Sequence, residues 1–121
     1  MIQIFGTLKN FDVKTAQRFF AERRISVQFV DLKEKEMSRG EFESVIECLS
    51  KKCGSRMEAI EQLTDKKSKE YASIQYLDDS EKEQKLFENQ LKLLKQPVCR
   101  NGKIQATVGL CQKEWNEWKS N

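Results

Sequence analysis

The chain has 121 residues, of which 38% are hydrophobic and 34% charged, and its formal net charge is +3. This balance suits one folded domain with a modest core, and one proline with five glycines excludes a long flexible linker. No apolar run approaches the roughly 20 residues of a membrane-spanning helix, and the mixed charges lack the basic stripe that nucleic-acid binding needs.

The first quarter of the sequence predicts a strand, a helix and a second strand. Apolar residues at 2–5 form a short strand that ends at Gly6. Residues 12–24 have helical periodicity, with Asp12 near the start as a candidate cap. The apolar side of this helix comprises Val13, Ala16, Phe19 and Phe20. A strand at 27–30 follows, and two strands joined by a helix most simply pair in parallel through a right-handed crossover.

Helices are expected to fill the middle of the chain. Ser38-Arg-Gly-Glu41 has the spacing of a capping box, so a helix begins there, and Cys53-Gly54 is a typical helix end. Cys48 lies within this helix and is expected to be a small core or boundary residue. Further helical segments are expected at 57–63, 67–76 and 80–94. The last of these has an apolar side made of Leu86, Phe87, Leu91 and Leu94.

The last third of the chain predicts a β-hairpin followed by a helix. Two β-like runs within 97–109 are joined by Asn101-Gly102, a dipeptide that favours a two-residue type I′ turn. Arg100 is therefore expected at the hairpin tip, facing solvent. The final helix carries Trp115 and Trp118 on one face, and we expect both to pack in the core. The alternative, a platform for stacking bases, requires exposed aromatic residues on a basic sheet.

Four cysteines and the absence of histidine limit the chemistry of the chain. The cysteines are Cys48, Cys53, Cys99 and Cys111, and their spacings form neither a CxxC motif nor a paired zinc pattern. Zinc sites with histidine, Ser/His/Asp sets and Cys/His sets are excluded, and we expect no metal and no cofactor. Because Met1 leads directly into the expected strand, we expect no signal peptide. We therefore expect a cytoplasmic monomer with reduced thiols and no membrane partner.

Several short motifs follow one another along the whole chain in a characteristic order. They are Ile4-Phe-Gly6, Lys14, Ala16–Phe20, Phe29–Lys33, Ser38 with Glu41, Lys67–Tyr71, Leu94–Val98, Arg100–Lys103, Val108-Gly109 and Trp115. In this order they resemble the ArsC/Spx family, which comprises glutaredoxin-coupled arsenate reductases, the regulator Spx and relatives. The resemblance implies a single α/β, thioredoxin-like domain over 1–121. Its expected order is β-α-β, inserted helices at 56–94, then β-hairpin-α, with a mixed four-stranded sheet.

The resemblance places the family's nucleophilic cysteine on Asn10, or on Phe11 after a shift of one residue. The second position of its CxxC or CxxS pattern falls on Val13. In thioredoxin-like proteins this turn presents a sulfur at a helix N-terminus, where the helix dipole lowers the thiol pKa. An amide cannot form a thiolate. We therefore expect a degenerate active site.

Three further positions follow from the same resemblance. The arginine that precedes the family's proline is matched by Gln96, and the arginine near the end of the last strand is matched by Leu110. The arginine of the helical region falls on or near Lys66, and Pro97 matches the family's cis-proline. Two of the three arginine positions are thus neutral, although arsenate reduction needs cationic forks to bind the oxyanion.

These losses predict a non-catalytic binding or regulatory module. The expected groove residues are Lys9, Asn10, Phe11, Gln96 and Pro97. Such a groove would hold a peptide or a small anion through backbone N–H groups. Asn10 is more readily explained as the cap of the first helix than as a ligand contact. The likeness to Spx implies RNA polymerase as one candidate partner.

The alternative is an arsenate reductase-like or glutaredoxin-like thiol oxidoreductase that uses a displaced cysteine. Cys99 lies two residues after Pro97, and Cys111 lies just beyond the final strand, so either thiol could reach the groove. Strand alternation places Cys99 on the face of Pro97. A reactive thiol would need electropositive surroundings, for which the candidates are Lys9, Lys66 and Arg100. Otherwise both cysteines are small buried apolar residues.

Overall fold

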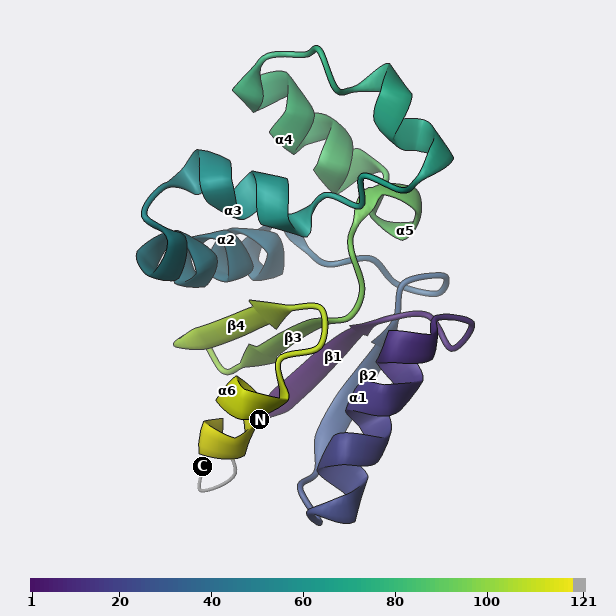
Figure 1. Ribbon diagram of the computed structural model, residues 1–121, viewed down its shortest axis with the longest axis vertical. Coiled ribbons are helices and arrows are strands. Elements are labelled where there is room, and N and C mark those ends of the chain that lie inside the picture. Colours follow the sequence, from purple (N-terminus) through teal and green to yellow (C-terminus); the bar gives the residue numbers. More distant parts are fainter. Residues whose placement is uncertain (119–121) are drawn as a thin grey trace.

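The computed structural model describes residues 1–118 and contains a mixed four-stranded sheet with helices on both faces (Figure 1). The strands are β1 (Ile2–Gly6), β2 (Val27–Asp31), β3 (Val98–Asn101) and β4 (Gln105–Val108). Their order is β2-β1-β3-β4; β1 pairs parallel with β2, and the other two pairings are antiparallel. The predicted α/β class, parallel βαβ unit and mixed sheet are confirmed.

The helices form layers on the two faces of the sheet (Figure 1). They are α1 (Phe11–Glu22), α2 (Arg39–Cys53), α3 (Arg56–Leu63), the 3-10 helix η1 (Lys69–Ser73), α4 (Asp79–Glu88), α5 (Gln90–Leu93) and α6 (Gln112–Trp118). One face carries α1 and α6; α2 covers the other, with α3, η1 and α4 stacked beyond it. Within residues 1–118, no helix is long and apolar enough to cross a bilayer.

An aromatic core fills the space between the sheet, α1 and α6. Trp115 and Trp118 are buried there. The ring centroid of Trp115 lies 5.4 Å from that of Phe19 and 5.3 Å from that of Phe20. Its Nε1 donates a hydrogen bond to Thr107 Oγ1 at 2.8 Å, which satisfies the one polar group of the ring. The packing role predicted for both tryptophans is confirmed, and the predicted apolar side of α1 is buried in the same core.

Local signals set most of the helix ends. The capping box at the start of α2 is present: Ser38 Oγ accepts from the Glu41 N–H at 3.1 Å, and Glu41 Oε1 accepts from the Ser38 N–H at 2.9 Å. This helix ends at Gly54, whose φ of +100° lies in the left-handed region that favours glycine. The predicted helices 12–24 and 67–76 are both too long: α1 ends at Glu22, and 67–76 contains helix only as η1.

The predicted helix 80–94 is interrupted at Asn89, which separates α4 from α5. Asn89 has φ −128° and ψ 47°, so the backbone leaves the helical region there. The interruption turns Gln90 inward, where its amide accepts from the Met37 N–H at 2.7 Å and donates to the Met37 carbonyl at 3.0 Å. Leu91, expected on the apolar side, is instead 38% exposed. Gln90, which is not on the predicted apolar side, is therefore buried, whereas Leu91, which is on it, is partly exposed.

The hairpin is present, but its turn differs from the prediction. Asn101 belongs to β3 and pairs with Gln105, so the loop comprises the three residues 102–104. The Asn101 Nδ2 donates to Gln105 Oε1 at 2.9 Å, which supports this extra pair of the ladder. In the loop only Gly102 has a positive φ (+57°), whereas a type I′ turn needs two such residues. Arg100 consequently lies within β3 and is half-buried, which corrects its expected place at a solvent-facing tip.

Candidate functional site

The turn between β1 and α1 is closed by Asn10. Its Oδ1 accepts a hydrogen bond from the Val13 N–H at 3.1 Å, and its own N–H donates to the Thr7 carbonyl at 3.1 Å. Asn10 is thus the N-cap of α1, as predicted, and its side-chain oxygen and backbone N–H are used within the turn. Asp12 is not the cap, because α1 begins one residue earlier, at Phe11.

Gln96 reaches the same turn from the segment before β3. Its Oε1 accepts from the Thr7 N–H at 2.8 Å and lies 3.3 Å from Thr7 Oγ1. The bond between Gln96 and Pro97 is cis, as the resemblance implied. Packing here is tight, since a Cβ on Gly6 would lie 2.5 Å from Val13 Cγ2 and 3.1 Å from Gln96 Oε1. Glycine is therefore required where β1, α1 and Gln96 meet.

A cleft of about 620 Å³ opens beside this turn; we call it the turn cleft. It is lined by Asn10, Asp12, Glu58, Glu61, Gln62, Thr64, Asp65, Lys66, Lys67, Lys95 and Gln96. Four of these residues are acidic and three are lysines. Lys66 Nζ lies 2.9 Å from Glu61 Oε2, and the hydrogen bond from Lys66 lowers the pKa of Glu61. The turn cleft therefore carries mixed charge without a surplus of positive charge.

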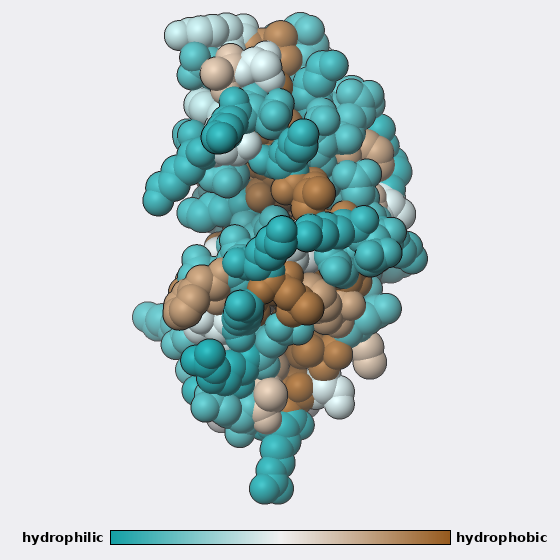
Figure 2. Space-filling model, turned by 90° about the vertical axis from the view of Figure 1, so that its right-hand side faces the viewer, coloured by the Kyte–Doolittle hydropathy of each residue, from teal (hydrophilic) through white to brown (hydrophobic). Residues whose placement is uncertain are grey.

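The structure brings only some of the predicted site residues into the turn cleft. Three of them line it: Asn10, Lys66 and Gln96. Five lie outside the lining: Lys9, Phe11, Val13, Pro97 and Leu110. Val13 and Pro97 are buried, whereas Phe11 is 73% exposed and Leu110 is 46% exposed. Figure 2, viewed from the side of the turn, shows hydrophobic side chains at the surface in patches among hydrophilic ones.

The contribution of α3 to the turn cleft was not predicted. Glu58, Glu61 and Gln62 line it from α3, and Thr64 and Asp65 from the segment that follows. A bridge between Thr64 and Leu94, with a hydrogen bond of 2.7 Å from the Asp65 N–H to the Leu93 carbonyl, joins this segment to the one that precedes Gln96. This contact joins segments far apart in the sequence, so local patterns do not predict it. Lys66 is the one residue of the segment after α3 that the sequence predicted for the site.

The thiols lie outside the turn cleft. Cys99 is fully buried in the aromatic core, and this burial raises its pKa strongly. Burial also raises the pKa of Cys111, which is half-buried and donates to the Val108 carbonyl at 3.3 Å, and that of Cys48 in α2. Arg100 faces away from Cys99, because neighbouring strand residues point to opposite faces. Among residues 1–118, no group of three or more His, Cys, Asp or Glu could hold a metal ion.

No protein-family model matches the sequence, and no curated protein matches it. Solved structures match the chain over almost its whole length. An arsenate reductase from Vibrio cholerae is 17% identical, with a TM-score of 0.77 and coverage of 96% of this chain and 95% of that chain. A Bacteroides fragilis protein provisionally described as ArsC family related is 15% identical, with a TM-score of 0.78 and coverage of 98% of each chain.

A third match, an arsenate reductase (ArsC) related protein from Brucella melitensis, is 15% identical, with a TM-score of 0.63 and coverage of 96% of this chain and 92% of that chain. At sequence identities this low, the matches support the fold alone. The β-α-β unit, the helical layer and the hairpin with its closing helix therefore form the thioredoxin-like fold that is found in arsenate reductase-like proteins.

Proposed function

We propose that this chain is a non-catalytic binding or regulatory module built on the fold of arsenate reductase-like proteins. The observation that carries the proposal is that Asn10, the residue matched to the family's nucleophilic cysteine, caps α1. Arsenate reduction requires a thiolate that attacks arsenic, and a side-chain amide cannot supply one. The Asn10 amide is instead engaged as a helix cap, 3.1 Å from the Val13 nitrogen.

The positions that match the family's arginines support the same conclusion. Gln96 is neutral, and its Oε1 is held by the Thr7 N–H; Leu110 is neutral as well. Lys66 keeps a positive charge, but it is paired with Glu61. An arsenate ion in the turn cleft would meet four carboxylates beside three lysines, without the bidentate arginine contacts that favour oxyanions.

A polar segment of another protein suits the turn cleft better than a small anion does. The lining combines the side-chain amides of Asn10, Gln62 and Gln96 with charges of both signs. Within residues 1–118, the hydrogen bonds of Asn10 and Gln96 use only their side-chain oxygens, so their NH2 groups can donate to a ligand. A peptide backbone presents donors and acceptors that such amides can pair with. RNA polymerase, which the likeness to Spx alone suggests, is one protein to test as the partner.

The first test is a glutaredoxin-coupled assay of arsenate reduction, with an active arsenate reductase as the reference. We expect the wild-type protein and a Cys111→Ser variant to give the same rate as the assay without protein. Turnover by the wild-type protein that Cys111→Ser abolishes would overturn the proposal, because it would identify a working displaced thiol.

Alkylation of the native protein gives an independent test that needs no substrate. Iodoacetamide labelling across roughly pH 5 to 9, mapped by mass spectrometry, reports the thiolate fraction of each cysteine. We expect Cys99 and Cys111 to react more slowly than in the urea-unfolded chain, because burial raises the pKa of both thiols. Fast modification of either thiol below about pH 7 would instead favour the enzyme.

A further inference from the structure

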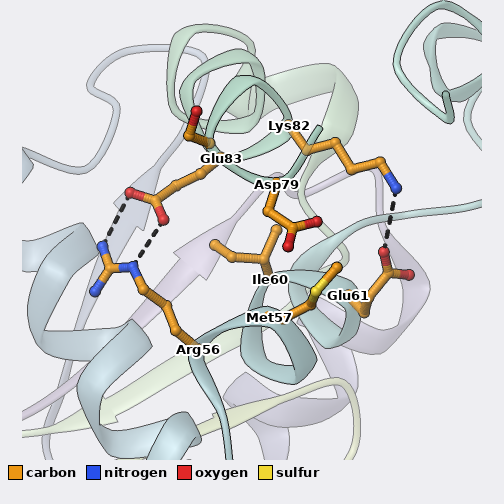
Figure 3. A pocket seen from close by; sticks show the side chains of 8 residues that line it. Arg56, Met57, Ile60, Glu61, Asp79, Lys82 and Glu83 are labelled. Carbon is orange, nitrogen blue, oxygen red and sulfur yellow. Dashed lines mark hydrogen bonds and ion pairs between the residues drawn. The ribbon is translucent and has the colours of Figure 1, made fainter. Parts of the chain in front are cut away.

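A second hollow, of about 330 Å³, lies between α3 and α4, and we call it the α3–α4 slot. It is lined by Arg56, Met57, Ile60, Glu61, Asp79, Ser80, Lys82 and Glu83. Its volume is at the small end of the range for ligand pockets, enough for one compact organic molecule. Figure 3 shows Met57 and Ile60 on the α3 side and Asp79 opposite them, with charged pairs to either side.

Two ion pairs connect the helices across the slot (Figure 3). On one side the Arg56 guanidinium forms two hydrogen bonds with the Glu83 carboxylate, from Nε to Oε1 at 2.8 Å and from Nη2 to Oε2 at 2.9 Å. On the other side Lys82 Nζ lies 3.6 Å from Glu61 Oε1. Because these pairs join α3 to α4 at both ends of the hollow, the slot is formed before any ligand arrives.

The floor of the slot is apolar. Ile60 belongs to the core but borders the slot, and Met57 is 43% exposed beside it. Exposed methionine is a flexible and polarizable surface that adapts to apolar ligands. A ligand that covers Met57 and the accessible part of Ile60 would remove apolar surface from water, which favours binding.

The charged groups around this floor are already paired, with one exception. Arg56 also donates to Glu43, from Nη1 at 2.6 Å and from Nη2 at 2.7 Å, so its guanidinium is occupied by two carboxylates. These hydrogen bonds raise the pKa of Arg56. Lys82 is held by Glu61. Asp79, in contrast, has no ion pair and accepts no hydrogen bond through its carboxylate within residues 1–118, and Figure 3 shows it pointing into the space between the two pairs.

This arrangement decides the sign of a suitable ligand. The lining holds three carboxylates against two cations, and both cations are engaged. Asp79 lies in the first turn of α4, where the helix dipole stabilises a carboxylate. The dipole accounts for this acidic residue but not for the apolar floor in front of it. An anion would find no unengaged cation and would be repelled by Asp79. A cation could pair with the Asp79 carboxylate, which is the one charged group of the lining without a partner within residues 1–118.

We propose that the α3–α4 slot binds a small organic cation, a compact apolar or aromatic body that carries one amine. The body would cover Met57 and Ile60, and the ammonium would pair with the Asp79 carboxylate. Charge-assisted hydrogen bonds of this kind are the stronger class. The proposal does not depend on the proposed function of the turn cleft, because it uses different residues for contact with the ligand.

Tryptamine and indole-3-acetate provide a matched pair of probes with the same ring and opposite charge. In a titration followed by ¹H–¹⁵N correlation NMR, we expect tryptamine to shift the amide signals of 56–61 and 79–83 saturably, with a Kd of about 1 mM or tighter. Indole-3-acetate should bind at least about tenfold more weakly. Equal binding of the two probes, or no saturable shift with tryptamine, would overturn the proposal.

Three variants locate the interaction. Asp79→Asn should weaken tryptamine about threefold or more, because Asp79 is exposed and solvent screens the ion pair. Met57→Ala should weaken it while leaving the preference for the cation intact. Glu47→Gln makes the same change in net charge on an exposed position of α2 and should have no effect. Full affinity in both Asp79→Asn and Met57→Ala, or shifts confined to the turn cleft, would show that the slot is not the binding site.

Discussion

The turn cleft and the α3–α4 slot both border α3 and share Glu61, but they use their polar groups differently. At the turn, Asn10 and Gln96 satisfy backbone donors of the same turn. At the slot, the ion pairs lie at the two sides, and one carboxylate, that of Asp79, has no partner within residues 1–118. The side-chain oxygens at the turn are thus engaged within the turn, whereas the slot has a carboxylate without a partner within residues 1–118 beside an apolar floor.

Fold likeness and binding capacity are therefore separate properties of this chain. Likeness to solved structures shows the fold, but the same fold carries different sites in different proteins. What a region can bind depends on the groups that internal bonds leave unused. By that criterion the turn offers neutral amides and mixed charge, and the slot offers one carboxylate and apolar surface. Variants of Gly6 and Asn10 test how firmly the turn is held together, and a variant of Glu43 tests how far the slot depends on the charges beside it.

The largest effect is expected from Gly6→Ala. The new Cβ would lie 2.5 Å from Val13 Cγ2 and 3.1 Å from Gln96 Oε1, so β1, α1 or the Gln96 side chain must shift. Overpacking of this kind costs about 1–3 kcal/mol of unfolding free energy. Urea denaturation measures the loss, and NMR shifts of Thr7 and Gln96 report whether the bonded turn opens.

Gly40→Ala is the matched control, because it adds the same methyl group to an exposed position of α2. The nearest atom to its new Cβ is Ser38 Oγ, at 4.0 Å. Alanine in a helix is favoured over glycine by up to about 1 kcal/mol, so this variant should be neutral or stabilised. If Gly6→Ala were equally neutral, the turn would be looser than the structure shows, and its polar groups would be accessible to a ligand.

Asn10→Ala should have a smaller effect on the same turn. Removing the side-chain oxygen leaves the Val13 N–H without its partner, and loss of an N-cap costs about 1 kcal/mol. Asn10→Ser should recover most of the loss, since serine is a comparable cap. Thermal or urea unfolding of the three proteins checks this order. If Asn10→Ala were as stable as the wild type, the amide would be available for a ligand rather than engaged as a cap.

Most of the fold could be predicted from local signals. The glycine at the end of β1, the apolar side of α1, the Ser38–Glu41 box and Gly54 act within one or two helical turns, and each has the predicted role in the structure. The turn of the hairpin could not be predicted in this way. There the pairing of Asn101 with Gln105 adds one step to the ladder and outweighs the preference of Asn-Gly for a two-residue turn.

The candidate sites could be predicted only in part. Asn10 and Gln96 were found because the resemblance assigned them to family positions, and the cap role of Asn10 followed from its residue type. The acidic lining from α3 and the whole α3–α4 slot depend on contacts between segments far apart in the sequence. The break at Asn89 shows the same limit, since a buried amide bonded to Met37 overrides the apolar periodicity of 80–94.

The smallest effect is expected from Glu43→Gln, which tests the ion pairs beside the slot. The hydrogen bond from Arg56 lowers the pKa of Glu43 below its ordinary value of 4.5. A carboxylate with a lowered pKa adds stability above the pKa of the unfolded chain, and this stability is lost as the pH falls through the folded-state value. The Arg56 side chain is 45% exposed and the Glu43 side chain 41% exposed. Solvent screening therefore limits the contribution of this ion pair to the free energy of unfolding to about 0.5 kcal/mol at pH 7.

Urea denaturation of the wild type and Glu43→Gln at pH 7 and pH 3 checks this expectation. The difference between the two proteins should shrink at pH 3, where Glu43 is increasingly protonated, and in 1 M salt, which reduces the screening length to about 3 Å. Arg56 keeps its two hydrogen bonds to Glu83 in the variant, so the wall of the slot should persist and tryptamine should bind with little change. A large loss of tryptamine affinity would show that Glu43 holds Arg56 in place, and that the slot depends on the whole cluster of charges rather than on Asp79.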